Sequence, residues 1–352
     1  MSTSTFVSPP SNPAVVFTPA ADYPAVVTSF PDEGMPSPER IGEEISHVLN
    51  MTLSPRLEYW ASRYAEVGKR NIYLWKWCRQ GVEITTLPCV LPELRDEVGD
   101  TRVLGIMLDV LLDDVADRKG DERLLEKLLS LSFDAPPPDF SEFPSEQRAY
   151  GKLTVEVWEE IKARAAKFPR YAEYAKLLRY DYLQLFNVMR YSHLVNENLS
   201  LLNMAEHELY TPHNMHMIIS STLDLLCSPN FDGDELGALR DLVWHAQCMG
   251  RVGNLITTWE RELADGDYTS GVYAHALAGG DVTLAQLRGN DREQIRAGVV
   301  RGGHERHFID SWHEHRRYLL SKAHLIRSFD FGVIIKGLER LICIHLGSRG
   351  YK

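Results

Sequence analysis

The stretch 107–117, MLDVLLDDVAD, constrains the fold of this chain more than any other. Its apolar residues recur three and four positions apart, which is the spacing of one buried helix face. The run ends in three carboxylates, Asp113, Asp114 and Asp117. Acids crowded at the end of a buried helix repel one another and are costly unless a cation neutralises them. Because all the ligands are oxygens, a hard ion such as Mg²⁺ is indicated. The alternative is a charged helix end that faces solvent.

A second stretch, 252–267, VGNLITTWERELADGD, carries a complementary set of oxygen ligands. Asn254, Thr258 and Glu262 are spaced four residues apart, so on a helix they form one stripe. Their amide, hydroxyl and carboxylate oxygens could hold a further Mg²⁺. Arg261 stands beside Glu262 and is suited to grip a phosphate group. The alternative for this stretch is an ordinary polar helix face.

Together these motifs resemble the metal-binding motifs of bacterial-type class I terpene synthases. DDVAD at 113–117 is similar to the aspartate-rich motif of that family. NLITTWERE at 254–262 is similar to its second metal motif, Asn-x-x-x-Ser/Thr-x-x-x-Glu, which has a basic residue just before the glutamate. A third resemblance lies in LERLICIHLGSRGY, which is similar to the family's last helix with its Arg-Tyr pair. Here a glycine separates Arg349 from Tyr351.

The resemblance covers residues 40–351 and implies the fold, the reaction and the ligands. We expect an all-α class I terpene synthase-like bundle of about ten to twelve helices around a deep apolar cavity. We expect a Mg²⁺-dependent cyclase, a carbon–oxygen lyase acting on phosphates, that ionises a linear prenyl diphosphate and releases diphosphate. The C20 substrate is favoured and the C15 substrate is next, because leucines rather than aromatics precede Asp113. Three Mg²⁺ ions are expected, and the implied metal ligands are Asp113, Asp114, Asp117, Asn254, Thr258 and Glu262. Arg261, Arg349 and Tyr351 would bind diphosphate and, with Asp113, promote its departure.

One departure from the family pattern concerns the arginine that senses diphosphate. The corresponding stretch, 208–224, contains no arginine. His213 or Asn214 could take that place, or Arg190 could reach in from the preceding helix. Most aromatic residues are expected in the core. A few, such as Phe186 and Tyr191, are candidates to face the cavity, where ring faces stabilise a carbocation.

The rest of the chain fits one soluble helical domain. Residues 1–35 carry many prolines but no lysine or arginine, which predicts a disordered tail before a catalytic domain over 36–352. No long apolar run predicts stable membrane insertion. A net charge of −11 argues against nucleic acid as a partner, and the resemblance makes a homodimer possible. Five scattered cysteines favour a reducing, cytoplasmic location.

Two other functions remain open at the level of sequence. A trans-prenyltransferase on the same fold would carry two aspartate-rich motifs, and 254–262 is not one. A non-catalytic helical binding protein with a decayed site would explain the missing sensor arginine, but the intact metal ligands oppose it. Arg316-Arg317-Tyr318 is a rival for the Arg-Tyr pair.

Overall fold

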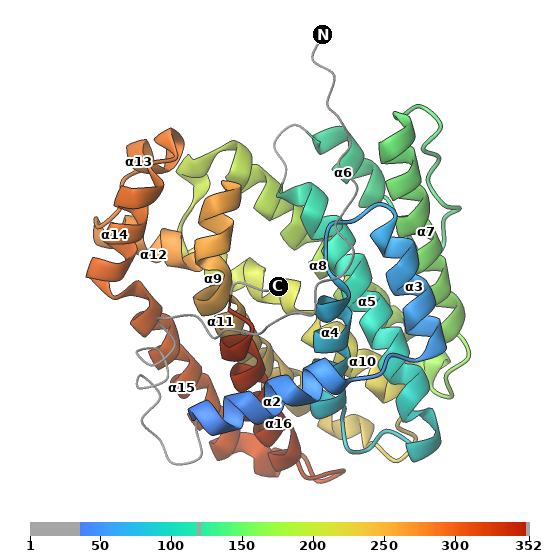
Figure 1. The fold of residues 1–352 in the computed structure, drawn as a ribbon. Helices are drawn as coiled ribbons and strands as arrows, with labels where there is room; N and C mark the ends of the chain where they lie inside the picture. The colour runs from blue at the N-terminus through green and yellow to red at the C-terminus, as the bar shows by residue number, and fades with distance from the viewer. Residues whose placement is uncertain (1–35, 118–120, 350–352) are drawn as a thin grey trace.

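The computed structural model describes residues 36–117 and 121–349. The predicted tail at 1–35 and the candidate diphosphate ligand Tyr351 therefore lie outside the described residues. Within those two ranges all regular structure is helical, as Figure 1 shows, and no strand is present. The expectation of an all-α protein is confirmed. The described part has fifteen α-helices, more than the predicted ten to twelve, because several connections form short helices of one or two turns.

The helices follow one another along the chain with these bounds. The first eight are α2 (Pro38–Asn50), α3 (Pro55–Ala65), α4 (Ile72–Thr85), α5 (Arg95–Ala116), α6 (Glu122–Leu128), α7 (Ser145–Ala165), α8 (Tyr171–Glu197) and α9 (Met204–Tyr210). The others are α10 (Met217–Leu226), α11 (Leu236–Asp265), α12 (Gly271–Gly279), α13 (Leu284–Gly289), α14 (Arg292–Gly302), α15 (His304–Lys322) and α16 (Gly332–Gly347). Short 3₁₀ helices occupy Pro92–Leu94, Leu199–Leu201, Thr211–Met215, Gly233–Glu235 and Ala323–Leu325.

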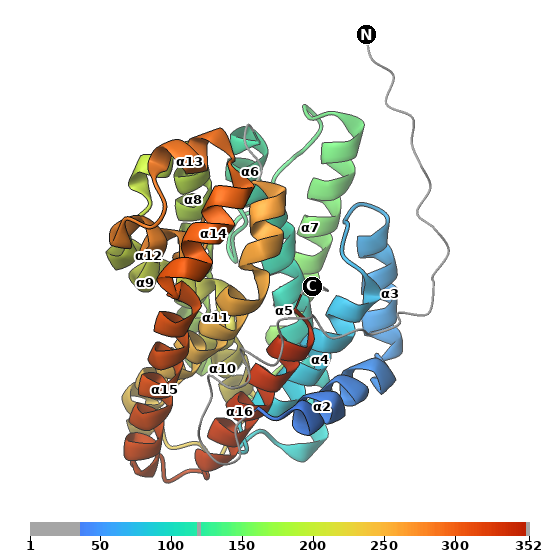
Figure 2. The same ribbon diagram turned by 60° about the vertical axis from the view of Figure 1, so that its left-hand side comes forward.

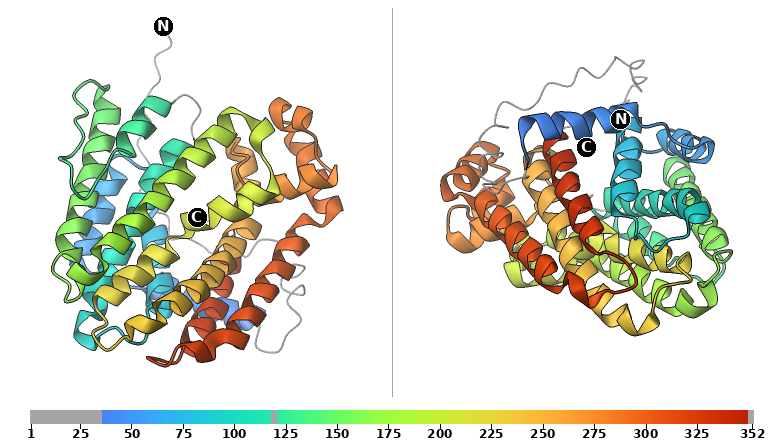
Figure 3. Two further views of the ribbon diagram at one scale, coloured as in Figure 1. Left: turned by 180° about the vertical axis from the view of Figure 1, so that it is seen from behind. Right: turned by 90° about the horizontal axis from the view of Figure 1, so that it is seen from below.

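Two long helices, α5 and α11, carry the two predicted metal motifs and share α10 as a neighbour. Helix α5 packs on α4, α7, α8 and α10, whereas α11 packs on α10, α12, α15 and α16. Helix α2 crosses one face of the bundle against α4 and α16, as Figure 2 and the view from below in Figure 3 show. Helix α10 contacts both α5 and α11 and so fixes the distance between the two motif-bearing helices.

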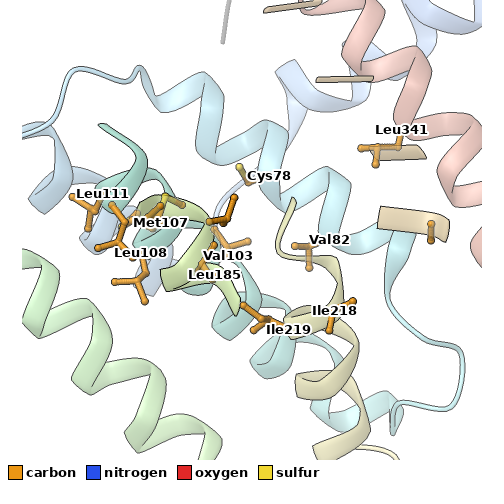
Figure 4. Packing of buried hydrophobic residues seen from close by; sticks show 14 of the residues in the cluster. Cys78, Val82, Val103, Met107, Leu108, Leu111, Leu185, Ile218, Ile219 and Leu341 are labelled. Atoms are coloured by element: carbon orange, nitrogen blue, oxygen red, sulfur yellow. The ribbon is translucent and has the colours of Figure 1, made fainter. Parts of the chain in front are cut away.

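The buried face of α5 sets its position in the bundle. Met107, Leu108 and Leu111 are fully buried, and Figure 4 shows them close to Leu185 of α8. A buried ion pair joins α5 to α10, since Arg102 donates to Asp224 Oδ2 at 3.0 Å. Both partners are nearly inaccessible, with side-chain exposures of 3% and 1%. Removing one member of such a pair leaves an uncompensated buried charge, so this pair ties the two helices together.

The chain breaks its helical path between α9 and α10. Pro212 lies in this stretch, and a proline inside a helical run removes a backbone donor and breaks the helix. The helical path is divided in two here, because the chain forms a 3₁₀ turn at Thr211–Met215 and then passes through His216 with φ 58°. This left-handed conformation is uncommon for a residue with a side chain. The break directs Asn214 and Met215 into the cavity described below.

One hydrophobic cluster runs from α2 to α16 through the described residues. In the part of the chain at 36–117 and 121–349, no helix is both long enough and apolar enough to cross a membrane.

Candidate metal and diphosphate site

A cavity of about 170 Å³ lies between α5 and α11 and brings the two motifs together. Asp113 and Asp117 line it from the α5 side, and Asn254, Arg261 and Glu262 line it from α11. The other lining residues are Leu74, Trp77, Cys78, Ile106, Asp109, Val110, Ser192, Thr211, Asn214, Met215, Arg251, Asp267, Thr269 and His345. Most of the predicted oxygen ligands therefore face one space, although they come from distant parts of the chain.

On the α5 side the two aspartates are held in an unfavourable charged environment. Asn214 Nδ2 donates to Asp113 Oδ1 at 2.9 Å, so the amide from the helix break orients this carboxylate. Burial raises the pKa of Asp113, although the Asn214 hydrogen bond opposes the shift. Burial, and then the charge of Asp113, raises the pKa of Asp117 well above its usual range. Burial and neighbouring carboxylates thus disfavour the charged form of these acids.

Asp114 differs from its predicted role as a metal ligand. Its carboxylate accepts hydrogen bonds from Tyr64 Oη at 2.9 Å and from Arg70 Nη2 at 2.7 Å. The residue is not among those that line the cavity in the described chain. Each residue turns a helix by about 100°, so Asp114 points away from the face that Asp113 and Asp117 share. In this position it fixes Arg70 beside the acidic end of α5.

On the α11 side, Glu262 is the carboxylate most affected by its surroundings. Burial, and then the charge of Asp267, raises its pKa to about 7. Thr258 Oγ1 donates to Glu262 Oε1 at 2.6 Å, whereas Oε2 is buried and has no hydrogen-bond partner in the described residues. Thr258 lies behind Glu262 and is not a cavity-lining residue. An unpartnered buried carboxylate oxygen that faces further acids fits a cation site.

The cations of the site are Arg251 and Arg261, and sequence reasoning missed the first of them. Arg251 Nη1 donates to Asn254 Oδ1 at 2.9 Å, and its Nε is buried and unpartnered within the described ranges. Arg261 Nη1 donates to Asp265 Oδ2 at 2.9 Å. Arg251 stands three residues before Asn254, so extending the polar stripe of the second motif back by one turn would have found it.

Two acids of the cavity were also missed. Asp267 follows the end of α11 and accepts from the backbone and hydroxyl of Thr269, both at 2.9 Å. Asp109 is buried one turn before Asp113, and its Oδ1 has no hydrogen-bond partner in the described chain. The spacing of four residues between Asp109 and Asp113 is a signal that could have found it, because such residues share a helix face.

Four other predicted site residues lie elsewhere, and none of them is a lining residue of the cavity in the described structure. Arg190 is half exposed and forms two hydrogen bonds to Glu126 at 2.8 and 3.1 Å. Phe186 packs on Trp158 within the core, and Tyr191 packs on Tyr210.

Arg349 faces two glutamates rather than the cavity. Its Nη2 donates to Glu260 at 3.1 Å and to Glu305 at 2.9 Å. Because α11 carries its carboxylates on more than one face, an arginine from the C-terminal end can pair outside the predicted site. Glu260 and Glu262 are two residues apart and therefore point in different directions.

The acids lining the cavity do not form a ready-made metal cage. No group of three or more His, Cys, Asp or Glu side chains among the described residues is arranged to hold a metal ion. Asn254 contributes an amide oxygen to the cavity, and Mg²⁺ commonly keeps several waters and binds substrate phosphates.

No family model matches this chain, and a comparison with curated proteins found no match either. The function must therefore be argued from the cavity. Its distinguishing feature is a set of acids and amides on two opposed helices, with two arginines beside them.

Proposed function

We propose that the protein is a Mg²⁺-dependent class I terpene cyclase that ionises a linear prenyl diphosphate and cyclises the resulting carbocation. The observation that carries this proposal is the meeting of the two motifs. Asp113 and Asp117 line the cavity from α5, and Asn254 and Glu262 line it from α11. A solvated helix end or an ordinary polar face, the alternatives weighed for each motif, would not require the two to share a buried space.

Different residues of the cavity would bind the metal ions and the diphosphate group. Asp113, Asp117, Asn254 and Glu262, with Thr258 behind them, would hold Mg²⁺. Bound there, Mg²⁺ supplies positive charge against the negative charge that develops on the diphosphate as the C–O bond breaks. Arginine side chains donate charge-assisted hydrogen bonds to phosphate oxygens.

Arg251 is suited to replace the sensor arginine that the sequence lacks between 208 and 224. It lines the cavity, and its guanidinium has a spare buried Nε–H while Nη1 is held by Asn254. In the proposed complex the diphosphate takes donors from Arg251, which releases the Asn254 amide oxygen as a metal ligand. Substrate arrival and metal binding are thus linked through one hydrogen bond.

The apolar side of the cavity would receive the prenyl chain. Leu74, Ile106, Val110 and Met215 line it and exclude the water that would quench a carbocation early. The cavity of about 170 Å³ is smaller than the roughly 300–1,000 Å³ of typical ligand pockets, so a C15 or C20 chain requires more space. A neighbouring cavity of about 340 Å³ between the helix break, α11 and α15 shares Thr211 and Arg251. Movement of Arg251 towards diphosphate would connect the two.

Incubation with C10, C15, C20 and C25 prenyl diphosphates and Mg²⁺ tests the proposal. Two quantities are measured, the inorganic diphosphate released and the products in a hexane extract by mass spectrometry. We expect cyclic terpenes, with the C20 substrate favoured and the C15 substrate next. Longer prenyl diphosphates would instead identify a prenyltransferase, and unchanged substrate would identify a binding protein. Either result contradicts the cyclase.

Two variants and one control locate the reaction in this cavity. Asp117→Asn removes a carboxylate that lines the cavity, and Arg251→Ala removes the proposed diphosphate donor. Each should lower turnover by about 10²–10³-fold, as the loss of one electrostatic stabiliser of a transition state does. Arg190→Ala removes a half-exposed arginine paired with Glu126 outside the cavity and should leave turnover unchanged. If Asp117→Asn keeps wild-type activity, the assigned metal site is refuted.

A further inference from the structure

Three buried polar atoms on or against the α5 segment 105–109 have no hydrogen-bond partner in the described residues. They are Asp109 Oδ1, Tyr182 Oη and His216 Nε2, and none of the three has a hydrogen-bond partner within residues 36–117 and 121–349. Their residues are 5%, 1% and 1% exposed, respectively. Buried polar groups nearly always have partners, so three unsatisfied atoms in one place require an explanation.

Gly105 lies against two of the three side chains, those of Tyr182 and His216. A Cβ added to this glycine would lie 2.5 Å from His216 Nε2 and 3.2 Å from Tyr182 Oη. Gly105 is one turn before Asp109 on the same face of α5, and the charge of Asp109 acts on the Tyr182 hydroxyl. The polar ends of Tyr182 and His216 therefore meet at Gly105, and Asp109 follows one turn later on the same face of α5.

The backbone holds His216 in this position at some cost. His216 has φ 58° and ψ 5° at the junction of the 3₁₀ turn and α10. A left-handed conformation at a residue other than glycine is strained, and such residues cluster at functional sites. His216 Nδ1 lies 3.2 Å from Ser220 Oγ, which fixes the ring so that Nε2 faces Gly105.

A water molecule satisfies the chemistry of these three atoms. A buried water commonly makes about three hydrogen bonds to groups that would otherwise be unpartnered. The hydroxyl of Tyr182 both donates and accepts, and Asp109 and His216 each offer a lone pair or a proton according to their protonation. Burial, and then Arg102, lowers the pKa of His216 to about 3, so the imidazole is neutral at neutral pH. No cluster of metal ligands includes these residues in the described chain.

We propose that Asp109, Tyr182 and His216 hold one water molecule at the wall of the cavity and that this water captures the last carbocation. The product would then be a terpene alcohol rather than a hydrocarbon. This inference rests on the proposed cyclase function. Asp109 lines the cavity, so a water bound to it has access to the prenyl chain, whereas Tyr182 and His216 hold it from behind.

The capture step is balanced without any oxidant or reductant. The diphosphate leaves with the electron pair of its C–O bond, and cyclisation moves the positive charge to a ring carbon. A lone pair of the water oxygen forms a C–O bond to that carbon, which gives a protonated alcohol. This oxonium is far more acidic than a carboxylic acid or an imidazolium, so a lone pair of Asp109 or of His216 Nε2 takes the proton and leaves the neutral alcohol.

The test is to run the reaction with the full chain, Mg²⁺ and the prenyl diphosphates in H₂¹⁸O and to measure ¹⁸O in the product. We expect a cyclic alcohol that carries ¹⁸O. Tyr182→Phe keeps the buried ring and removes one ligand of the water. It should lower the ratio of alcohol to hydrocarbon about tenfold, the effect of losing about 1.4 kcal/mol of hydrogen bonding, and leave total diphosphate release within about twofold. Tyr180→Phe, on the exposed face of the same helix, is the matched control and should change neither quantity.

Gly105→Ala tests the same space from the other helix. Its methyl group would meet the His216 ring and displace the water, so it should also turn the product towards hydrocarbon. If the wild-type enzyme releases diphosphate but forms only hydrocarbons, or if Tyr182→Phe leaves the alcohol fraction unchanged, the water-capture proposal is overturned and the cyclase proposal stands.

If no prenyl diphosphate is consumed, the cyclase proposal fails and the capture step fails with it. The water site is then judged by a high-resolution crystal structure of the protein. A water within hydrogen-bond distance of the three side chains supports the site, and direct contacts among them without water overturn it.

Discussion

Neutralising Glu262 should stabilise the metal-free protein, although it removes a residue of the proposed site. Burial and the charge of Asp267 raise the pKa of Glu262 from 4.5 to about 7. A carboxyl group with a raised folded-state pKa stabilises the fold fully below its unfolded-state pKa, and this contribution is lost as the pH rises through the folded-state value. Above pH 7 the ionised, buried Glu262 therefore opposes folding.

The size of this destabilisation follows from the shift in the pKa of Glu262. One pKa unit corresponds to about 1.4 kcal/mol, so a shift from 4.5 to about 7 is a penalty of about 3 kcal/mol at pH 8 and about 1 kcal/mol at pH 5. Glu262→Gln removes the charge and keeps the side-chain oxygen that accepts from Thr258. We expect the variant to be more stable than wild type by about these amounts in the presence of a chelator.

Urea unfolding at pH 5 and pH 8, without metal, measures both differences. Glu66→Gln, whose side chain is 66% exposed, is the control and should change stability by less than about 0.5 kcal/mol. A second series of unfolding measurements includes Mg²⁺ and inorganic diphosphate. These ligands should stabilise the wild type by about 2.7 kcal/mol at a hundredfold excess over Kd, and they should stabilise Glu262→Gln much less. A Gln variant that is less stable than wild type at pH 8 would refute the charge repulsion on which the site is built.

Three further predictions concern other parts of the fold. Burial, and then the nearby His245 of α11, lowers the pKa of His315 to about 4. The neutral His315 ring therefore contributes its full stability above pH 6.5, and this contribution is lost as the pH falls towards 4. His315→Gln should reduce the slope of unfolding free energy against pH by about 1.4 kcal/mol per unit between pH 4.5 and 6, and an unchanged slope would contradict this. Asp224→Asn leaves its buried arginine partner uncompensated and should lower stability by about 3–5 kcal/mol. Asp96→Asn removes a 99% exposed carboxylate from its ion pair with Arg79 and should cost about 0–1 kcal/mol; equal losses in urea unfolding would refute the assignment. Gly337→Ala would place a methyl group 2.0 Å from a backbone oxygen of α4 and should lower the thermal midpoint by the equivalent of about 1–3 kcal/mol or more. The control Gly42→Ala, with nothing near the added methyl group, should be neutral or stabilising by about 0.5–1 kcal/mol. If Gly337→Ala is tolerated, α16 and α4 are less closely packed than the structure indicates.

Most of the secondary structure could be predicted from the sequence because local signals agree with the fold. Helix α5 shows the three- and four-residue apolar spacing expected of a buried helix, and Pro212 marks the break before α10. The short helices α6, α9 and α13 were not separated in advance, since six or seven residues are too few for a periodic pattern to show.

The candidate site was predictable only in part, and the failures have a common cause. A motif fixes which residues share a helix face, so Asp113 and Asp117 were placed together and Arg251 could have been added by the same rule. A motif does not determine which neighbouring residue pairs with a side chain that points away from this face. Arg70 and Tyr64 hold Asp114, and such partners come from chain segments that helical periodicity does not connect.

The sequence by itself determined the helices, the acidic end of α5 and the oxygen-bearing stripe of α11, because these depend on spacing along one element. The tertiary structure decided that the two faces line one cavity and that Arg349 pairs with Glu260 and Glu305 instead. It also decided that Tyr182 and His216 meet beside Gly105, one turn before Asp109. The reason is geometric: three helices and one strained turn bring these groups together, and the distances between helices are set by packing over the whole core rather than by any single stretch of chain.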